Sequence, residues 1–72
     1  MKNKIKEYRE RKNLSQGKVA ELCNVSRQTI NAIENDKYDP SLQLAFDLAK
    51  VLDAKVDELF LGERKDEEWN FL

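Results

Sequence analysis

The segment Ser15–Lys37, SQGKVAELCNVSRQTINAIENDK, constrains the fold more than any other part of the chain. In its first half, the apolar residues have the spacing of a helix that buries one face: Val19, Ala20, Leu22 and Cys23. In its second half, Ile30 and Ile33 lie three positions apart and repeat this pattern. Between them, Asn24 tolerates the left-handed backbone conformation that reverses a chain after a helix. The segment therefore predicts two short amphipathic helices joined by a tight turn.

Three serines stand where helices are expected to begin, because each can accept a hydrogen bond from a backbone N–H of the first turn: Ser15, Ser26 and Ser41. Pro40 keeps the residue before it out of helical geometry, which separates the third helix from the fourth. We expect five helices, over residues 2–12, 16–23, 27–35, 42–52 and 56–60, with Gly62 ending the last. The fold class is therefore all-α.

The fourth predicted helix should lie at the centre of the core. Its apolar residues with helical spacing form one stripe: Leu42, Ala45, Leu48, Ala49 and Leu52. Leu44 and Phe46 fall off this stripe, so they need cover from a neighbouring element or from a second subunit. Cys23 is expected to be a small core residue and not a reactive thiol, because its neighbours are apolar.

Composition limits the functions that are open to the chain. Its 72 residues, 40% apolar and 38% charged, fit one small helical domain. There is no histidine and one cysteine, so we expect no disulfide, metal centre, cofactor or catalytic constellation. No run approaches the roughly 18 apolar residues of a membrane span, and Met1 leads straight into charged residues. We therefore expect a cytoplasmic protein that is not an enzyme.

The net charge of −1 at first argues against a nucleic-acid partner, but the charge is unevenly distributed. Residues 1–37 carry nine Lys and Arg against five Asp and Glu, a balance of +4. Residues 38–72 carry four against nine, a balance of −5. A basic half that bears the two short helices can still be steered toward DNA.

An inward-facing arginine predicts an ion pair between the first and third helices. Arg9 shares the apolar face of the first helix with Ile5 and Tyr8, and an isolated buried charge is costly. Glu34, beside Ile33, is the acid available on the third helix. The alternative is that Arg9 only lays its aliphatic stem over the core and keeps its charge in water.

The third predicted helix carries a polar face opposite Ile30 and Ile33. That face consists of Gln28, Asn31, Ala32 and Asn35, with Arg27 at its margin. Amide groups and a guanidinium suit the recognition of base edges. The alternative is a helix face that is merely solvated.

Several short motifs occur along the chain: Leu14-Ser15-Gln16, Ala20, Val25-Ser26, Arg27-Gln28-Thr29-Ile30, Ile33-Glu34-Asn35, Pro40-Ser41-Leu42 and Asp57-Glu58-Leu59-Phe60. Together they strongly resemble the Cro/phage-repressor type of helix-turn-helix DNA-binding domain, also called the XRE family. Arg9 and Glu34 match an ion pair of that family. Asn24 and Asp36 stand where the family usually has glycine, and Gly17 replaces a usual helix former. The resemblance covers a domain of residues 1–61, and the charged tail of residues 62–72 lies outside it.

The resemblance implies that the third helix enters the major groove of double-stranded DNA while the second crosses the phosphate backbone. Arg27 can then donate two hydrogen bonds to guanine, and Gln28 can pair with adenine. The further base readers expected are Thr29, Asn31 and Ala32. Gln16 is expected to contact a phosphate and to brace Gln28. The remaining backbone contacts expected are Lys18, Ser26, Asn35, Lys37 and Tyr38.

The resemblance also implies a homodimer, because one such domain reads only half of a site. Apolar surface for a symmetric contact is expected at Leu44 or Phe46, with Phe60 and Leu61. The tail ends in Trp69, Phe71 and Leu72, which either fray or dock on the body or a partner. We expect a dimeric repressor of a palindromic operator with no evident small-molecule effector. The alternative is a protein-binding module on the same scaffold, such as an antitoxin-like partner subunit.

Overall fold

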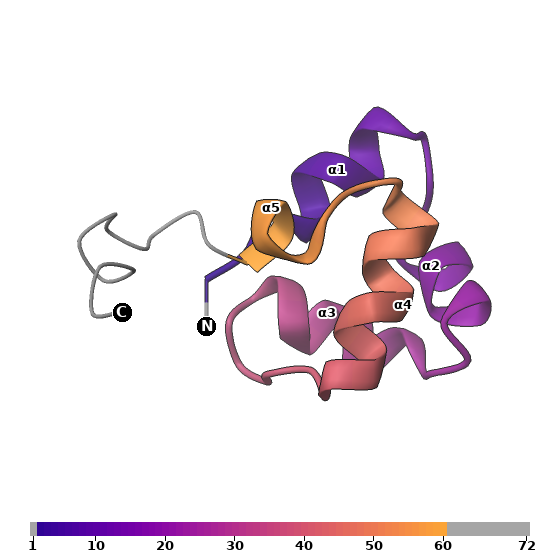
Figure 1. The fold of residues 1–72 in the computed structure, drawn as a ribbon. Coiled ribbons are helices and arrows are strands. Elements are labelled where there is room, and N and C mark those ends of the chain that lie inside the picture. The colour runs from indigo at the N-terminus through magenta and orange to yellow at the C-terminus, as the bar shows by residue number, and fades with distance from the viewer. Residues whose placement is uncertain (1, 61–72) are drawn as a thin grey trace, which may run out of the picture.

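The computed structural model describes residues 2–60, and over that range it contains five helices and no strand. They are α1 (Ile5–Arg11), α2 (Gln16–Leu22), α3 (Arg27–Glu34), α4 (Leu42–Leu52) and α5 (Val56–Phe60) (Figure 1). The all-α prediction is confirmed, and only the start of α1 differs by more than one residue from its predicted position. The expected stop at Gly62 and the domain boundary after residue 61 lie outside the described residues.

Helix α4 connects the other parts of the fold. It packs against α1, α2 and α5, while α2 packs on α3 and α1 packs on α5. Figure 1 shows α4 crossing the middle of the molecule with α1 and α5 together on one side of it. The N–H of Lys4 donates to the carbonyl of Leu59 at 2.8 Å, which fastens the start of the chain to α5.

All three predicted serine caps are present. Ser15 Oγ accepts from the N–H of Lys18 at 3.0 Å, and the other two serines accept from residues three positions later at 3.1 Å. Each cap satisfies a donor that the first turn of a helix leaves without an intrahelical partner. These serines therefore determine where α2, α3 and α4 begin.

The four turns after α1, α2, α3 and α4 each contain a residue in the left-handed region. These residues have φ between 54° and 61° and are Asn13, Asn24, Asp36 and Asp53. Asn and Asp enter this region more easily than other residues that carry a side chain. The prediction for Asn24 is confirmed, and Asp36 likewise forms its turn at a position where the resembled family usually has glycine.

The core is built from one or more buried side chains of every helix. Its largest fully buried members are Ile5, Val19, Ile30, Ile33, Leu48, Leu52 and Leu59. In α4 the prediction needs one correction, because Leu44 is buried while Leu42 remains 70% exposed. The buried stripe therefore follows the i, i+4 series Leu44, Leu48 and Leu52. Leu42, in the first turn of α4, is not covered by the neighbouring helices.

Two further expectations are wrong, one about the buried face of α2 and one about the first residue of α1. Leu22 is 51% exposed, although its spacing placed it with the buried face of α2. Helix α1 begins at Ile5 and not at Lys2, because the side-chain oxygen of Asn3 accepts a hydrogen bond from the backbone N–H of Ile5 at 3.1 Å. Asn3 also donates to the carbonyl of Ile33 at 2.7 Å, so this residue connects α1 to the end of α3.

The predicted ion pair between α1 and α3 is confirmed. Arg9 Nε lies 2.8 Å from Glu34 Oε2, and the two side chains are only 11% and 4% exposed. Arg9 Nη1 also donates to the carbonyl of Leu14 at 2.8 Å. The hydrogen bond that Arg9 donates to Glu34 raises the pKa of Arg9 above its ordinary value, although burial of the guanidinium lowers it. The guanidinium is therefore paired inside the fold and does not extend into water.

Replacement of Arg9 with Met should lower the free energy of unfolding by about 3 kcal/mol, because it leaves the Glu34 carboxylate buried without a counter-charge. The measurement is urea unfolding followed by circular dichroism. Adding Glu34→Met to Arg9→Met should restore much of the loss, since an apolar pair then fills the same space.

The matched control is Arg11→Met, which removes an exposed ion pair with Glu7 on the same helix. Its loss should be about 0.5 kcal/mol or less. Equal losses for Arg9→Met and Arg11→Met would contradict the structural role given to the buried pair.

Replacement of Gly17 with Ala should raise the free energy of unfolding by about 0.5 to 1 kcal/mol, because alanine restricts the unfolded chain and suits a helix better. An added Cβ would meet only Ser15 Oγ, at an ordinary 3.9 Å. The same urea titration measures the change. An unchanged or lowered stability would show that this position needs glycine for a reason other than space.

Candidate nucleic-acid interface

Helix α3 has one buried face and one exposed polar face. Ile30 and Ile33 are covered by the core, whereas Arg27, Gln28 and Asn31 are exposed. The Ser26 cap starts the helix directly before Arg27, so the polar residues lie on its first turns. The helix therefore presents two amides and one guanidinium to a ligand outside the molecule.

These polar residues surround one hollow in the surface. Its volume is about 400 Å³, and it is lined by Gln16 of α2 together with Arg27, Gln28 and Asn31 of α3. All four side chains carry hydrogen-bond donors, and the three amides carry acceptors as well. Such a lining suits a polar surface with its own donors and acceptors, as a base edge has.

Two residues expected to read bases are less accessible than the exposed residues of α3. Thr29 and Ala32 are half-buried. Ser26 Oγ accepts from the N–H of Thr29 at 3.1 Å and lies 2.9 Å from the Thr29 hydroxyl. The hydroxyl groups of Ser26 and Thr29 therefore both take part in the cap of α3. The exposed residues of the helix carry most of its polar surface.

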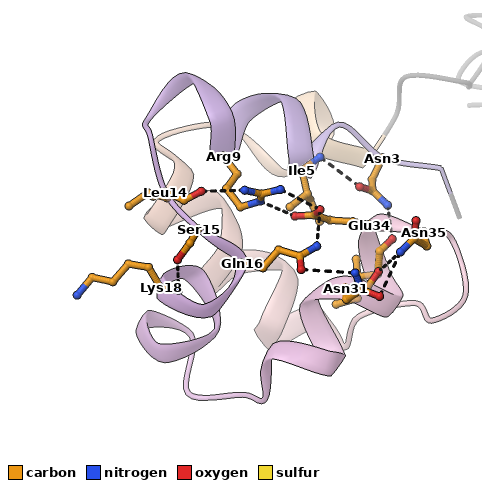
Figure 2. Close-up of polar contacts among 11 residues, drawn as sticks. Asn3, Ile5, Arg9, Leu14, Ser15, Gln16, Lys18, Asn31, Glu34 and Asn35 are labelled. Atoms are coloured by element: carbon orange, nitrogen blue, oxygen red, sulfur yellow. Dashed lines mark hydrogen bonds and ion pairs between the residues drawn. The ribbon is translucent and has the colours of Figure 1, made fainter.

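The side chain of Gln16 bonds to Glu34 and Asn31 and not to Gln28. Its Nε2 donates to Glu34 Oε1 at 3.0 Å, and its Oε1 accepts from Asn31 Nδ2 at 3.4 Å (Figure 2). The expectation that Gln16 braces Gln28 is wrong for this structure, because a carboxylate is a stronger acceptor than an amide oxygen.

The contact between Gln16 and Glu34 was not anticipated from the sequence. One signal could have indicated it, because a carboxylate has more lone pairs than a single arginine occupies. Once Glu34 is paired with Arg9, a donor at the start of α2 is the next candidate partner. The sequence does not show how close the start of α2 comes to the end of α3.

Most residues expected to contact the DNA backbone are exposed, and Gln16 is half-buried. The exposed ones are Lys18, Ser26, Asn35, Lys37 and Tyr38. Lys18 Nζ lies 3.5 Å from Glu21 Oε1 on the same helix. Such a surface ion pair contributes little, so Lys18 can exchange it for a phosphate.

A second hollow, of about 950 Å³, lies between α4 and α5. Its lining includes Phe46, which is 50% exposed, and Phe60. Leu44, expected at a dimer contact, is only 7% exposed because it faces the core, so that expectation is corrected. Leu61 lies outside the described residues.

The described part of the chain shows no group of three or more acidic or Cys side chains placed to hold a metal ion. Cys23 is buried, and this burial raises the pKa of its thiol, with the charge of Asp47 adding to the shift. The prediction that Cys23 is a core residue is confirmed. Among the described helices, none is both long and apolar enough to span a membrane.

Comparison with known proteins identifies the family. A family model described as helix-turn-helix matches residues 5–59. An uncharacterized HTH-type transcriptional regulator from Methanocaldococcus jannaschii is 54% identical over 63 residues, which cover 88% of this chain and 96% of the relative.

Solved structures agree with this match. The N-terminal DNA-binding domain of SinR from Bacillus subtilis is 31% identical and aligns over 85% of this chain and 90% of that domain, with a TM-score of 0.74. The restriction-modification controller protein C.AhdI from Aeromonas hydrophila is 34% identical over 78% of this chain and 85% of its own, with a TM-score of 0.73. The chain therefore belongs to the helix-turn-helix family of the Cro/phage-repressor type, the XRE family of DNA-binding transcriptional regulators.

Proposed function

We propose that this protein is a transcriptional regulator that binds double-stranded DNA as a dimer and represses by occupying a palindromic operator. The observation that carries the proposal is the exposed polar surface of α3, where Arg27, Gln28 and Asn31 surround one hollow with Gln16. The relatives support it, since one is named a transcriptional regulator and another a DNA-binding domain. Its site of action would be the cytoplasm, and no cofactor is part of the proposal.

Direct reading of bases would fall to the exposed residues of α3. The guanidinium of Arg27 can donate to guanine O6 and N7, and the amide of Gln28 can pair with adenine N6 and N7. Each such pair discriminates against the wrong base by about 1–3 kcal/mol. Asn31 would read a neighbouring position, with Thr29 and Ala32 limited to the contacts that half-buried side chains can make.

Contacts to phosphates would set the position of α3 in the groove. Their proposed donors lie at the start of α2 and around the two ends of α3: Gln16, Lys18, Ser26, Asn35, Lys37 and Tyr38. Such contacts carry no sequence information, but they fix the register of the protein on the duplex. The basic balance of residues 1–37 supports them, because that part of the chain holds α2 and α3.

Dimerisation would use the hollow between α4 and α5. Phe46 lines it and is half exposed, and Phe60 lines it from α5. Exposed apolar surface of this kind often marks a protein contact. A symmetric contact would place two α3 helices on half-sites about 34 Å apart, one turn of the duplex.

The hollow between α4 and α5 also suits the second candidate function, a protein-binding module on the same scaffold. In that case the apolar hollow would be the principal site, and the polar face of α3 would be solvated surface. The two functions differ in salt dependence, because binding to phosphates weakens steeply as salt rises.

Selection of bound duplexes from a random DNA pool should enrich a palindromic site, and the preference at distinct positions should relax in Arg27→Ala and in Gln28→Ala. Each relaxation should amount to about 1–3 kcal/mol at one base pair, because each variant removes one bidentate contact. Binding should weaken steeply with salt for the unsubstituted protein. Competition between site variants in a gel-shift assay measures both effects.

The matched control is Arg11→Ala, which removes an arginine that is exposed on α1. It should leave the base preferences as they are. If no site is enriched, or if the enriched site is the same in all variants, the base-reading role of α3 is refuted and the protein-binding module becomes the leading function.

Replacement of Phe46 with Glu should weaken the dimer by at least tenfold, because it places a charge in the proposed apolar contact. Sedimentation equilibrium over a concentration series measures the dissociation constant. Leu22→Glu is the matched control, since Leu22 is 51% exposed on α2 and does not line the α4–α5 hollow. Equal effects of the two substitutions, or a monomeric unsubstituted protein, would disprove this interface.

A further inference from the structure

Glu34 accepts hydrogen bonds from two sides of the molecule. Its Oε2 accepts from Arg9 Nε at 2.8 Å, while its Oε1 accepts from Arg9 Nη2 at 3.3 Å and from Gln16 Nε2 at 3.0 Å. The side chain is only 4% exposed, so these donors take the place of water. An ionised carboxylate has no hydrogen to donate. Only the amino end of Gln16 can therefore face Glu34.

The orientation of the Gln16 amide in turn sets the orientation of the next amides along the surface (Figure 2). With its amino end toward Glu34, Gln16 turns its oxygen toward Asn31, whose Nδ2 donates to it at 3.4 Å. Asn31 then turns its own oxygen toward Asn35, whose Nδ2 donates to it at 3.2 Å. Each amide has its amino end toward the ion pair and its oxygen away from it.

The orientation of Asn31 matters because it lines the hollow at the reading face. After these two hydrogen bonds its amino group still has a second hydrogen and its oxygen a second lone pair. Asparagine recognises adenine with these two groups, because its amino group donates to N7 and its oxygen accepts from the N6 amino group. A flipped amide would exchange the two positions and would no longer match the same base edge in the same register.

We propose that Gln16 and Glu34 are positioning residues for base recognition, Glu34 fixing which way the Gln16 amide points and Gln16 fixing which way the Asn31 amide points. Arg9 holds Glu34 in place for this role. The ion pair between α1 and α3 thereby influences which bases α3 selects. This inference rests on the proposed DNA-binding function.

The test uses Gln16→Met, because Glu34→Gln would also break the buried ion pair and lower stability. Methionine has nearly the length of glutamine but cannot accept from Asn31 in the same way. The control is Lys18→Met, a second proposed phosphate contact on α2 that has no part in the series of amides. Both variants should lose affinity for all duplexes by a similar factor, since each loses a phosphate contact.

Two measurements distinguish a change in the orientation of the Asn31 amide from a general loss of affinity for DNA. In DNA-free protein, the side-chain NH₂ signals of Asn31 in nitrogen-labelled samples should shift in Gln16→Met and stay in place in Lys18→Met. In duplex selection, Gln16→Met should lose about tenfold in preference at the position that also relaxes in Asn31→Ala, a discrimination of the size that one bidentate contact provides. Lys18→Met should keep that preference.

Unshifted Asn31 signals in Gln16→Met would overturn the proposal, and so would an unchanged base preference in a variant whose signals do shift. Failure of the unsubstituted protein to enrich any site would instead contradict the proposed function. The spectra would then still decide whether Gln16 orients Asn31, because they need no DNA.

Discussion

The ion pair between Arg9 and Glu34 is the interaction on which the arrangement of this small domain most depends. Helices α1 and α3 are not among the helix pairs that pack closely, so side chains make the link between them. Arg9 reaches Glu34 from α1, and Asn3 adds a hydrogen bond to the carbonyl of Ile33. Because both charged groups are shielded from water, removing either one leaves the other uncompensated. The position of α3 relative to the N-terminal part of the chain therefore depends on this pair.

The same carboxylate stands beside the proposed reading surface. Through Gln16 it connects the interior of the fold to Asn31, while the caps and left-handed turns determine where α2 and α3 begin and end. Under the proposed function, stability and base preference would be coupled at this one side chain. A substitution at Glu34 would then change both properties together, whereas a substitution at Gln16 would separate them.

Much of this structure could be predicted from the sequence because it depends on local chemistry. The serine caps, the turn at Asn24 and the pairing of Arg9 with Glu34 follow from hydrogen bonding and from the cost of a buried charge. The burial of Leu44 agrees with its i, i+4 spacing to Leu48 and Leu52, but the exposure of Leu42 could not be predicted, because periodicity does not say where a neighbouring helix ends.

The partner of Gln16 could not be derived either, since it depends on how two helices meet in space. At the candidate site, the exposed polar face of α3 lies where the sequence predicted it, and its reading of bases stays a prediction. Thr29 and Ala32 are less accessible than expected, because neither helical spacing nor a family resemblance gives the degree of burial.

Base reading by Arg27 can be tested by replacing one atom of the DNA. In the selected operator, the guanine whose preference depends on Arg27 is exchanged for 7-deazaguanine, which lacks the N7 acceptor. If Arg27 reads this guanine, the unsubstituted protein loses affinity by several-fold, while Arg27→Ala binds both duplexes equally, because the contact is already absent. An equal loss for both proteins, or no loss for either, would contradict reading of that base by Arg27.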